Sequence, residues 1–248
     1  MVKYSICITN YNMRNTLREC LESVFSQIDS DFEVVICDNF STDGSREILE
    51  EYARVGKIKL IIEHSNRGRG RQIAFENSKG DYIISGIDTD DMIRPVLKNV
   101  LREYHEKHEG YVLQFETIYI VPRHLVIAVG GWRDLQWGED IDFTKRIVAM
   151  GKSHYFPDLS RIVEKKRFLH KQSPLLYKPI DRYTYYQCRY KIGFNILDDQ
   201  VNYWYKLPIE VLIAISALAV LKIKRVRRFE YASDERAREY LAIWEKFP

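Results

Sequence analysis

The sequence lacks the features that mark secreted, membrane-spanning or repetitive proteins. Its longest apolar run, residues 211–221, has eleven residues including Ser216, and a helix needs about 20 to cross a bilayer. The apolar start at residues 4–9 is too short for a signal peptide, so we expect the protein to begin in the cytoplasm. No internal repeat or low-complexity linker divides the chain.

Cysteine is scarce, and little net charge remains after the two signs cancel. The four cysteines show no C-x-x-C spacing, and three of them fall in apolar patterns, which indicates buried thiols in a reducing compartment. A net charge of +3 is too small to suggest a nucleic-acid partner. With 248 residues, 46% of them hydrophobic and 29% charged, the composition fits one large α/β domain, or one domain with an appendage.

Apolar periodicity predicts an alternation of strands and helices from the start of the chain. Residues 3–9, 32–37 and 58–62 are predicted strands, and the three-and-four spacing that starts at Leu17 and near Ile48 predicts helices between them. This order indicates a parallel sheet with right-handed crossovers. Farther on we expect strands at 82–87 and 111–121, and helices after Pro95, from near Glu139 and at 232–247.

The clearest chemical signal directly follows the strand predicted at 82–87. Asp88, Asp90 and Asp91 stand at its carboxyl end, which is where ligands bind in open α/β sheets. Crowded carboxylates repel one another unless a cation intervenes, and oxygen ligands suit Mg²⁺ or Mn²⁺. The alternative is a polar turn in which Asp90 or Asp91 caps the next helix. A D-x-D triplet alone does not decide between them, because the chain contains three.

A basic stretch at residues 65–71 precedes a helix predicted at 72–79. Its two glycines and three arginines are typical of a loop that binds an anion. The alternative is a flexible basic loop facing solvent. The stretch is not a dinucleotide-binding fingerprint, because Ile73 stands where G-x-G-x-x-G requires its third glycine.

The last third of the chain is rich in aromatic and basic residues. Aromatic residues interleaved with Lys and Arg crowd residues 177–205, and the apolar run is followed by a basic cluster at 222–228. These features favour a helix near 207–224 that binds the anionic cytoplasmic face of a membrane. The alternative is a helix that packs on the preceding domain or on a second copy of the chain.

Taken in order, these motifs resemble glycosyltransferase family 2, whose members are inverting nucleotide-sugar transferases of the GT-A fold. The matching segments are ICITNYN (6–12), ICDNFSTDGS (36–45), NRGRGRQIAFENSKGDY (66–82), DTDD (88–91), VGGW (129–132) and GEDIDF (138–143). The resemblance covers roughly the first 170 residues. It implies a Rossmann-like GT-A domain with a mainly parallel central sheet flanked by helices, at 1–175. The nucleotide-sugar half would be about 1–91 and the acceptor half about 92–175, with a helical extension at 176–248.

The resemblance assigns donor-side roles position by position. The residues expected around the nucleotide are Thr9, Tyr11, Asp38, Arg71, Asp88 and Asp90. Asp90, and His170 unless that histidine is structural, would bind Mn²⁺ or Mg²⁺. The resemblance implies a UDP-sugar or GDP-sugar as donor, and the choice of base stays open because the usual Asp-Asp-Gly is replaced by Asp38-Asn39-Phe40.

On the acceptor side, the resemblance makes Asp140 the general base and places Glu139 beside the acceptor. Trp132 and Asp91 would lie near the sugar or the acceptor. The implied reaction is inverting transfer to a hydroxyl or phosphate of a glycan or lipid-linked acceptor. A sugar-phosphate nucleotidyltransferase is an alternative, although such enzymes usually carry a glycine-rich loop where residues 9–12 stand. A non-catalytic GT-A-like membrane protein is another, and the intact carboxylates argue against it.

Overall fold

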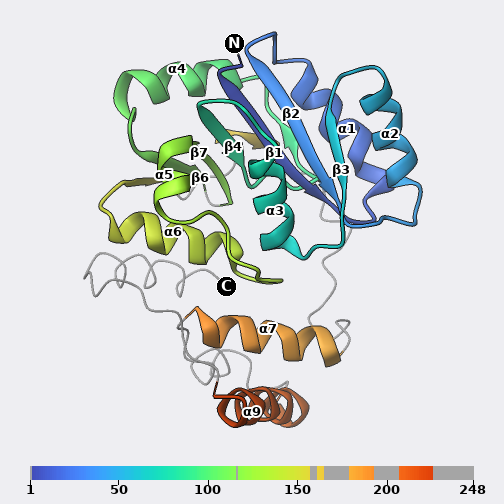
Figure 1. Ribbon diagram of the computed structural model, residues 1–248, viewed down its shortest axis with the longest axis vertical. Coiled ribbons are helices and arrows are strands. Elements are labelled where there is room, and N and C mark those ends of the chain that lie inside the picture. Colours follow the sequence, from blue (N-terminus) through green and yellow to red (C-terminus); the bar gives the residue numbers. More distant parts are fainter. Residues whose placement is uncertain (1, 116, 157–160, 165–178, 193–206, 226–248) are drawn as a thin grey trace.

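A seven-stranded sheet with the order β3-β2-β1-β4-β7-β6-β8 forms the centre of the protein (Figure 1). The computed structural model describes residues 2–115, 117–156, 161–164, 179–192 and 207–225. The strands of this sheet are β1 (Tyr4–Asn10), β2 (Phe32–Asp38), β3 (Lys59–Ile62), β4 (Tyr82–Ser85), β6 (Val112–Phe115), β7 (Ile118–Pro122) and β8 (Ser153–Phe156). A second, two-stranded sheet pairs β5 (Met92–Ile93) with β9 (Val163–Glu164).

Helices connect and cover the strands in the alternating order that the periodicity predicted. They are α1 (Arg14–Phe25), α2 (Ser45–Arg54), α3 (Arg67–Glu76), α4 (Leu97–Lys107), α5 (Arg123–Ala128), α6 (Glu139–Ala149), α7 (Pro179–Lys191) and α9 (Leu207–Ile223). Strands β3, β2, β1 and β4 are mutually parallel, so the predicted parallel sheet is confirmed. Beyond β4 the sheet is mixed, because β7 runs antiparallel to both β4 and β6.

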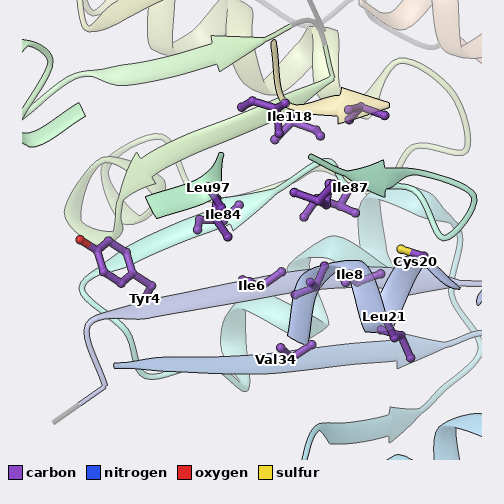
Figure 2. Close-up of a cluster of buried hydrophobic side chains, with 14 of the residues drawn as sticks. Tyr4, Ile6, Ile8, Cys20, Leu21, Val34, Ile84, Ile87, Leu97 and Ile118 are labelled. Atoms are coloured by element: carbon purple, nitrogen blue, oxygen red, sulfur yellow. The ribbon is translucent and has the colours of Figure 1, made fainter. Parts of the chain in front are cut away.

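Successive residues of the parallel strands point into two different apolar layers. Ile6 and Ile8 of β1 pack in a cluster with side chains of α1, α2 and α4 (Figure 2). Cys7, which lies between them, packs in a second cluster with side chains of α3, α5 and α6. Both faces of the sheet are therefore buried. This explains why its strands appear in the sequence as continuous apolar runs.

The strand predicted at 111–121 is wrong in one respect, because the segment forms two strands instead of one. Strands β6 and β7 pair antiparallel, with Phe115 opposite Ile118. The residues between them include no glycine, proline or asparagine, which are the usual signs of a reversal. Because the segment at 111–121 is mostly apolar and lacks turn residues, the sequence gives no sign of the reversal between the two strands.

Strand β4 ends at Ser85, two residues earlier than predicted, and the acidic segment lies on the loop that follows. Gly86 has a φ of 89°, and a Cβ there would lie 1.7 Å from the Thr117 carbonyl oxygen, so only glycine fits. Helix α4 begins at Leu97, after the short strand β5, and no side chain caps it. This excludes the alternative in which Asp90 or Asp91 caps a helix.

Helices α7 and α9 lie side by side, with Tyr186 and Ala217 buried between them (Figure 1). Helix α9 has 17 residues and is about 25 Å long. In the part of the chain that the structure describes, no helix is both long and apolar enough to cross a bilayer. The helix predicted at 232–247 and the domain boundary near residue 175 lie outside the described residues.

Candidate functional site

The loops that follow the four parallel strands meet along one edge of the sheet. Tyr11 follows β1, Phe40 follows β2, His64 lies two residues after β3, and Asp88 follows β4. Parallel neighbours place their carboxyl ends at the same edge, which is where open α/β sheets bind ligands. Of the residues predicted for the donor side, Tyr11, Asp88 and Asp90 lie on these loops, Thr9 and Asp38 lie at the ends of β1 and β2, and Arg71 lies in α3.

Hydrogen bonds tie the first two of these loops together around Asp38. This carboxylate is fully buried and accepts hydrogen bonds from Asn10 Nδ2 (2.7 Å), the Ser41 amide (2.9 Å) and Ser41 Oγ (2.6 Å). In turn Ser41 Oγ accepts a bond from the Asn12 amide at 2.9 Å. Asp38 thus holds the β2 loop in shape, and its contact with a nucleotide base stays a prediction.

The acidic segment closes on itself in a tight turn. The Asp88 amide donates to Asp91 Oδ2, and the Asp91 amide donates to the Asp88 carbonyl, both at 2.9 Å. Burial, followed by the nearby Asp88 carboxylate, raises the pKa of Asp91 to about 7. The loop therefore concentrates negative charge that a bound cation would neutralise.

These carboxylates suit a cation that is shared with a phosphate-bearing substrate. The side chain of Asp88 is about half exposed, so it is accessible to a ligand. Among the described residues, no group of three or more histidine, cysteine, aspartate or glutamate side chains is arranged to hold a metal. Mg²⁺ is often held by only one or two carboxylates, with phosphates and water completing its shell. His170 lies outside the described residues.

A buried arginine, Arg71 of α3, joins the acidic loop to the first turn of α6. Its Nε lies 3.0 Å from Glu139 Oε1, and its Nη2 lies 3.8 Å from Asp88 Oδ1. Burial alone would lower the pKa of Arg71, but Tyr119 and the carboxylates of Glu139, Asp88 and Asp140 raise it. Its third nitrogen, Nη1, is buried without a hydrogen-bond partner. The structure thus brings the two predicted acidic segments together around one guanidinium group, that of Arg71.

The two acids at the start of α6 differ in their accessibility. Glu139 is 2% exposed and forms the ion pair with Arg71. Burial, followed by the Asp140 carboxylate, raises the pKa of Glu139, although Arg71 opposes this. Asp140 is only partly buried, and its Oδ1 accepts a hydrogen bond from the Ile141 amide at 2.8 Å. Asp140 is therefore the more accessible of the two acids to a substrate.

Trp132, which the resemblance places near the sugar or the acceptor, lies in a buried aromatic cluster. It is 4% exposed, and its ring stacks on Phe143 with centroids 4.4 Å apart and an interplanar angle of 11°. Tyr119 packs on the same ring pair and was not singled out from the sequence. Burial raises the pKa of its hydroxyl, which interacts electrostatically with Arg71. A tyrosine in a buried strand looks like any other core residue in the sequence, so its position beside Arg71 could not be predicted.

Residues 66–71 do not form the predicted loop, flexible or otherwise, because they begin helix α3. Whether they bind an anion stays a prediction. The Asn66 side chain accepts a hydrogen bond from the Arg69 amide, and the Gly68 amide donates to the Leu135 carbonyl at 2.9 Å. A Cβ at Gly68 would lie 2.0 Å from the Arg133 carbonyl oxygen. The helix start is therefore covered by the loop at 133–135.

The three arginines of this segment have different partners. Arg67 lies over the ring of Trp137, and Arg69 pairs with Glu63 and Glu76. Arg71 forms the ion pairs with Glu139 and Asp88 described above.

A second buried ion-pair cluster fixes the loop before α6. Asp142 is fully buried between Arg133 (3.0 Å) and Arg146 (2.7 Å). Arg146 Nη1 also donates to the carbonyl oxygens of Val129 and Gly131. Sequence reasoning missed this cluster, because Asp142 was seen only as part of a D-x-D triplet. It orients the helix turn that carries Asp140.

Helix α7 packs on the outer side of the same loop. Leu135, Cys188 and Ile192 form a small apolar cluster, and Lys145 Nζ donates to the Ile192 carbonyl at 2.6 Å. The ring of Tyr185 meets Trp137 edge to face. The loop before α6, which carries Leu135 and Trp137, is thereby held between α3 and α7.

Known proteins match this chain both by family model and by sequence identity. The family model described as glycosyl transferase family 2 matches residues 5–198. The glycosyltransferase GlyA of Streptococcus pneumoniae serotype 4 is 30% identical over 157 residues, which cover 62% of this chain and 20% of that protein. The chain thus spans only a part of that relative.

Two solved structures show the same fold. Residues 1–349 of TarS from Staphylococcus aureus, in complex with UDP-GlcNAc, superpose with a TM-score of 0.59 at 20% identity, covering 75% of this chain and 65% of that one. The mannosyltransferase PcManGT from Pyrobaculum calidifontis, in complex with GDP-Man and Mn²⁺, gives 0.59 at 16% identity, covering 98% and 79%. At such low identity the likeness concerns the fold.

Proposed function

This chain belongs to glycosyltransferase family 2, and from that premise we propose that it transfers a sugar from a UDP-sugar or GDP-sugar to a hydroxyl or phosphate acceptor, with inversion. The observation that carries the proposal is Arg71, which contacts both Asp88 and Glu139. One site thus combines acids suited to a donor diphosphate with acids suited to an acceptor. The nucleotide sugars bound to TarS and PcManGT support the donor class.

On the donor side, Thr9, Tyr11 and Asp38 would surround the nucleoside, and Asp88 would hold the ribose. Asp90 would bind Mn²⁺ or Mg²⁺, with His170 as a further ligand. The crowded carboxylates of the 88–91 turn support this assignment, and so does the Mn²⁺ in the PcManGT complex. When bound, the cation would stabilise the charge of the leaving diphosphate as a Lewis acid.

On the acceptor side, Asp140 would remove the proton of the incoming hydroxyl. Its accessibility supports this role, and one general base acting opposite the leaving group gives inversion at the anomeric carbon. Glu139 would hold the α6 turn in place through Arg71, beside the acceptor. Asp91 and Trp132 would lie behind the sugar, with the ring of Trp132 giving structural support.

We assign the catalytic domain to residues 1–175, with a donor half at about 1–91 and an acceptor half at about 92–175. The extension at 176–248 would bind the cytoplasmic face of a membrane, where a lipid-linked acceptor would be accessible. Exposed Leu212, Ile215 and Ile223 on α9 support this proposal. Lys222 in the last turn of the helix and Lys224 just after it are basic, which suits an anionic lipid surface.

The test of the proposed chemistry is a pair of substitutions assayed with a panel of nucleotide sugars. Asp140→Asn should lower transfer by about 10²- to 10⁴-fold, because the general base is lost. Its affinity for the nucleotide sugar should stay within a few fold of the wild type. Asp90→Ala should instead lose the metal-dependent part of nucleotide binding. Normal turnover by Asp140→Asn would contradict the assignment of the base.

A further inference from the structure

An exposed aromatic pair stands at the carboxyl ends of β2 and β3. The rings of Phe40 and His64 stack with their centroids 4.1 Å apart and an interplanar angle of 24°. Phe40 is 39% exposed, and His64 is exposed as well. The pair therefore presents flat aromatic surface to solvent instead of filling the core.

The backbone at Phe40 is in the left-handed region, with a φ of 49°. Bulky residues rarely adopt this conformation, and glycine adopts it readily. Both neighbours are fixed, since the Asn39 amide donates to the Asn10 carbonyl and the Ser41 amide donates to Asp38. Neither backbone preference nor burial favours phenylalanine here, and strained residues of this kind cluster at ligand sites.

The pair is also fixed from the β3 side. The Ser65 amide, next to His64, donates to Asn39 Oδ1 at 3.1 Å, so the loops after β2 and β3 are joined beside the two rings. An aromatic ring held in this way loses little freedom when a ligand stacks on it.

The pair lies at the same edge of the sheet as the acidic turn. Strand β1 separates β2 from β4, so two strand spacings, about 10 Å, separate the ends of β2 and β4. The nucleoside of a nucleoside diphosphate extends over a similar distance when its diphosphate is held at the 88–91 turn. Exposed Tyr11, which follows β1, lies on the path between them.

We propose that Phe40 and His64 form the stacking wall for the nucleobase of the donor. This inference rests on the proposed function and adds the residues that hold the base. Stacking on aromatic side chains tolerates every base, because each base has a π face. The wall therefore supplies affinity for the nucleoside, and the hydrogen bonds of neighbouring loop residues select the base.

The decisive variant in the full-length protein is Phe40→Gly, which removes the ring and suits the left-handed backbone. Without ligand, its melting temperature should equal or exceed that of the wild type. Its affinity for UDP and GDP, measured by calorimetry with Mn²⁺, should fall about tenfold. Its affinity for pyrophosphate with Mn²⁺, a probe without a base, should stay unchanged.

Three further variants keep the inference testable. Phe40→Leu keeps apolar bulk and should lose nucleotide affinity like Phe40→Gly, whereas Phe40→Tyr should retain it. Val55→Gly removes an exposed apolar side chain from the end of α2, away from the site, and should leave nucleotide affinity unchanged.

Two results would overturn the inference while the proposed function survives. One is unchanged UDP and GDP affinity in Phe40→Gly. The other is an equal loss for pyrophosphate, which would show that the ring only supports the loop. If the wild-type protein binds neither UDP nor GDP, the proposed function fails first and the inference fails with it.

Discussion

At the scale of single residues, the site depends on one buried positively charged side chain, that of Arg71. Arg71 is 3% exposed, and its nearest charged partners are carboxylates from two distant segments of the chain. A buried charge is tolerated only while its partners remain. The ion pair therefore has a structural role that is separable from catalysis.

Replacing Arg71 by methionine should lower the free energy of unfolding by about 3–5 kcal/mol, because Glu139 would be left buried and unpaired. Adding Glu139→Gln should recover part of this loss, so the two substitutions should be non-additive in urea denaturation. The control is Arg18→Met, which breaks the exposed pair with Glu51 and should cost less than about 1 kcal/mol. Additive losses at Arg71 and Glu139 would contradict a coupled pair.

Motif order located Asp88, Asp140 and Arg71, because each stands at a fixed place relative to a predicted strand or helix. The direction of a side chain depended on residues far away in the sequence. Trp132 occupies the expected position in the chain, but its ring packs in the core against the ring of Phe143 in the following helix. The direction of the side chain is set by this packing and could not be predicted from the spacing of neighbouring residues.

At the scale of elements, glycines govern how α3 meets the loop at 133–135. The pattern of residues 66–71 predicted a loop that binds an anion, with a flexible loop facing solvent as the alternative. The structure uses Gly68 for a close backbone approach and Gly70 for contact with Thr9 of β1. Close approach by a segment more than sixty residues away cannot be predicted from one sequence.

Gly68→Ala tests this contact, because helix propensity and packing predict opposite signs. In an exposed helix the change should stabilise by up to about 1 kcal/mol. Here the new Cβ would lie 2.0 Å from the Arg133 carbonyl oxygen, so we expect a net loss of about 1–3 kcal/mol in urea denaturation. A rise in the free energy of unfolding would mean that the loop moves away freely.

At the scale of the whole molecule, the alternation of strands and helices was predictable because both faces of the sheet are buried. The chain reversal between β6 and β7 was not, for lack of turn residues. The apolar run at 211–221 does lie within a helix, α9, and that helix packs on α7 while exposing Leu212 and Ile215.

The exposed side of α9 gives a prediction about membranes. Leu212→Glu combined with Ile215→Glu should weaken flotation of the protein with anionic vesicles by more than tenfold, because burying each aliphatic side chain contributes about 1.5–3 kcal/mol. Val55→Glu places the same charge on another exposed aliphatic position and should float like the wild type. Equal flotation of the double variant would leave packing on the protein or on a second copy as the role of this face.

The pairing of β4 with β7 has a consequence for recombination between family members. A chimaera that joins residues 1–91 to the remainder of a relative would make its sheet continuous only if the foreign strand matched the register of Ser85 opposite Tyr119. It would also have to supply an acid where Glu139 meets Arg71. The segments before and after residue 91 can therefore be exchanged between family members only as compatible sets, which limits how freely shuffling can combine them.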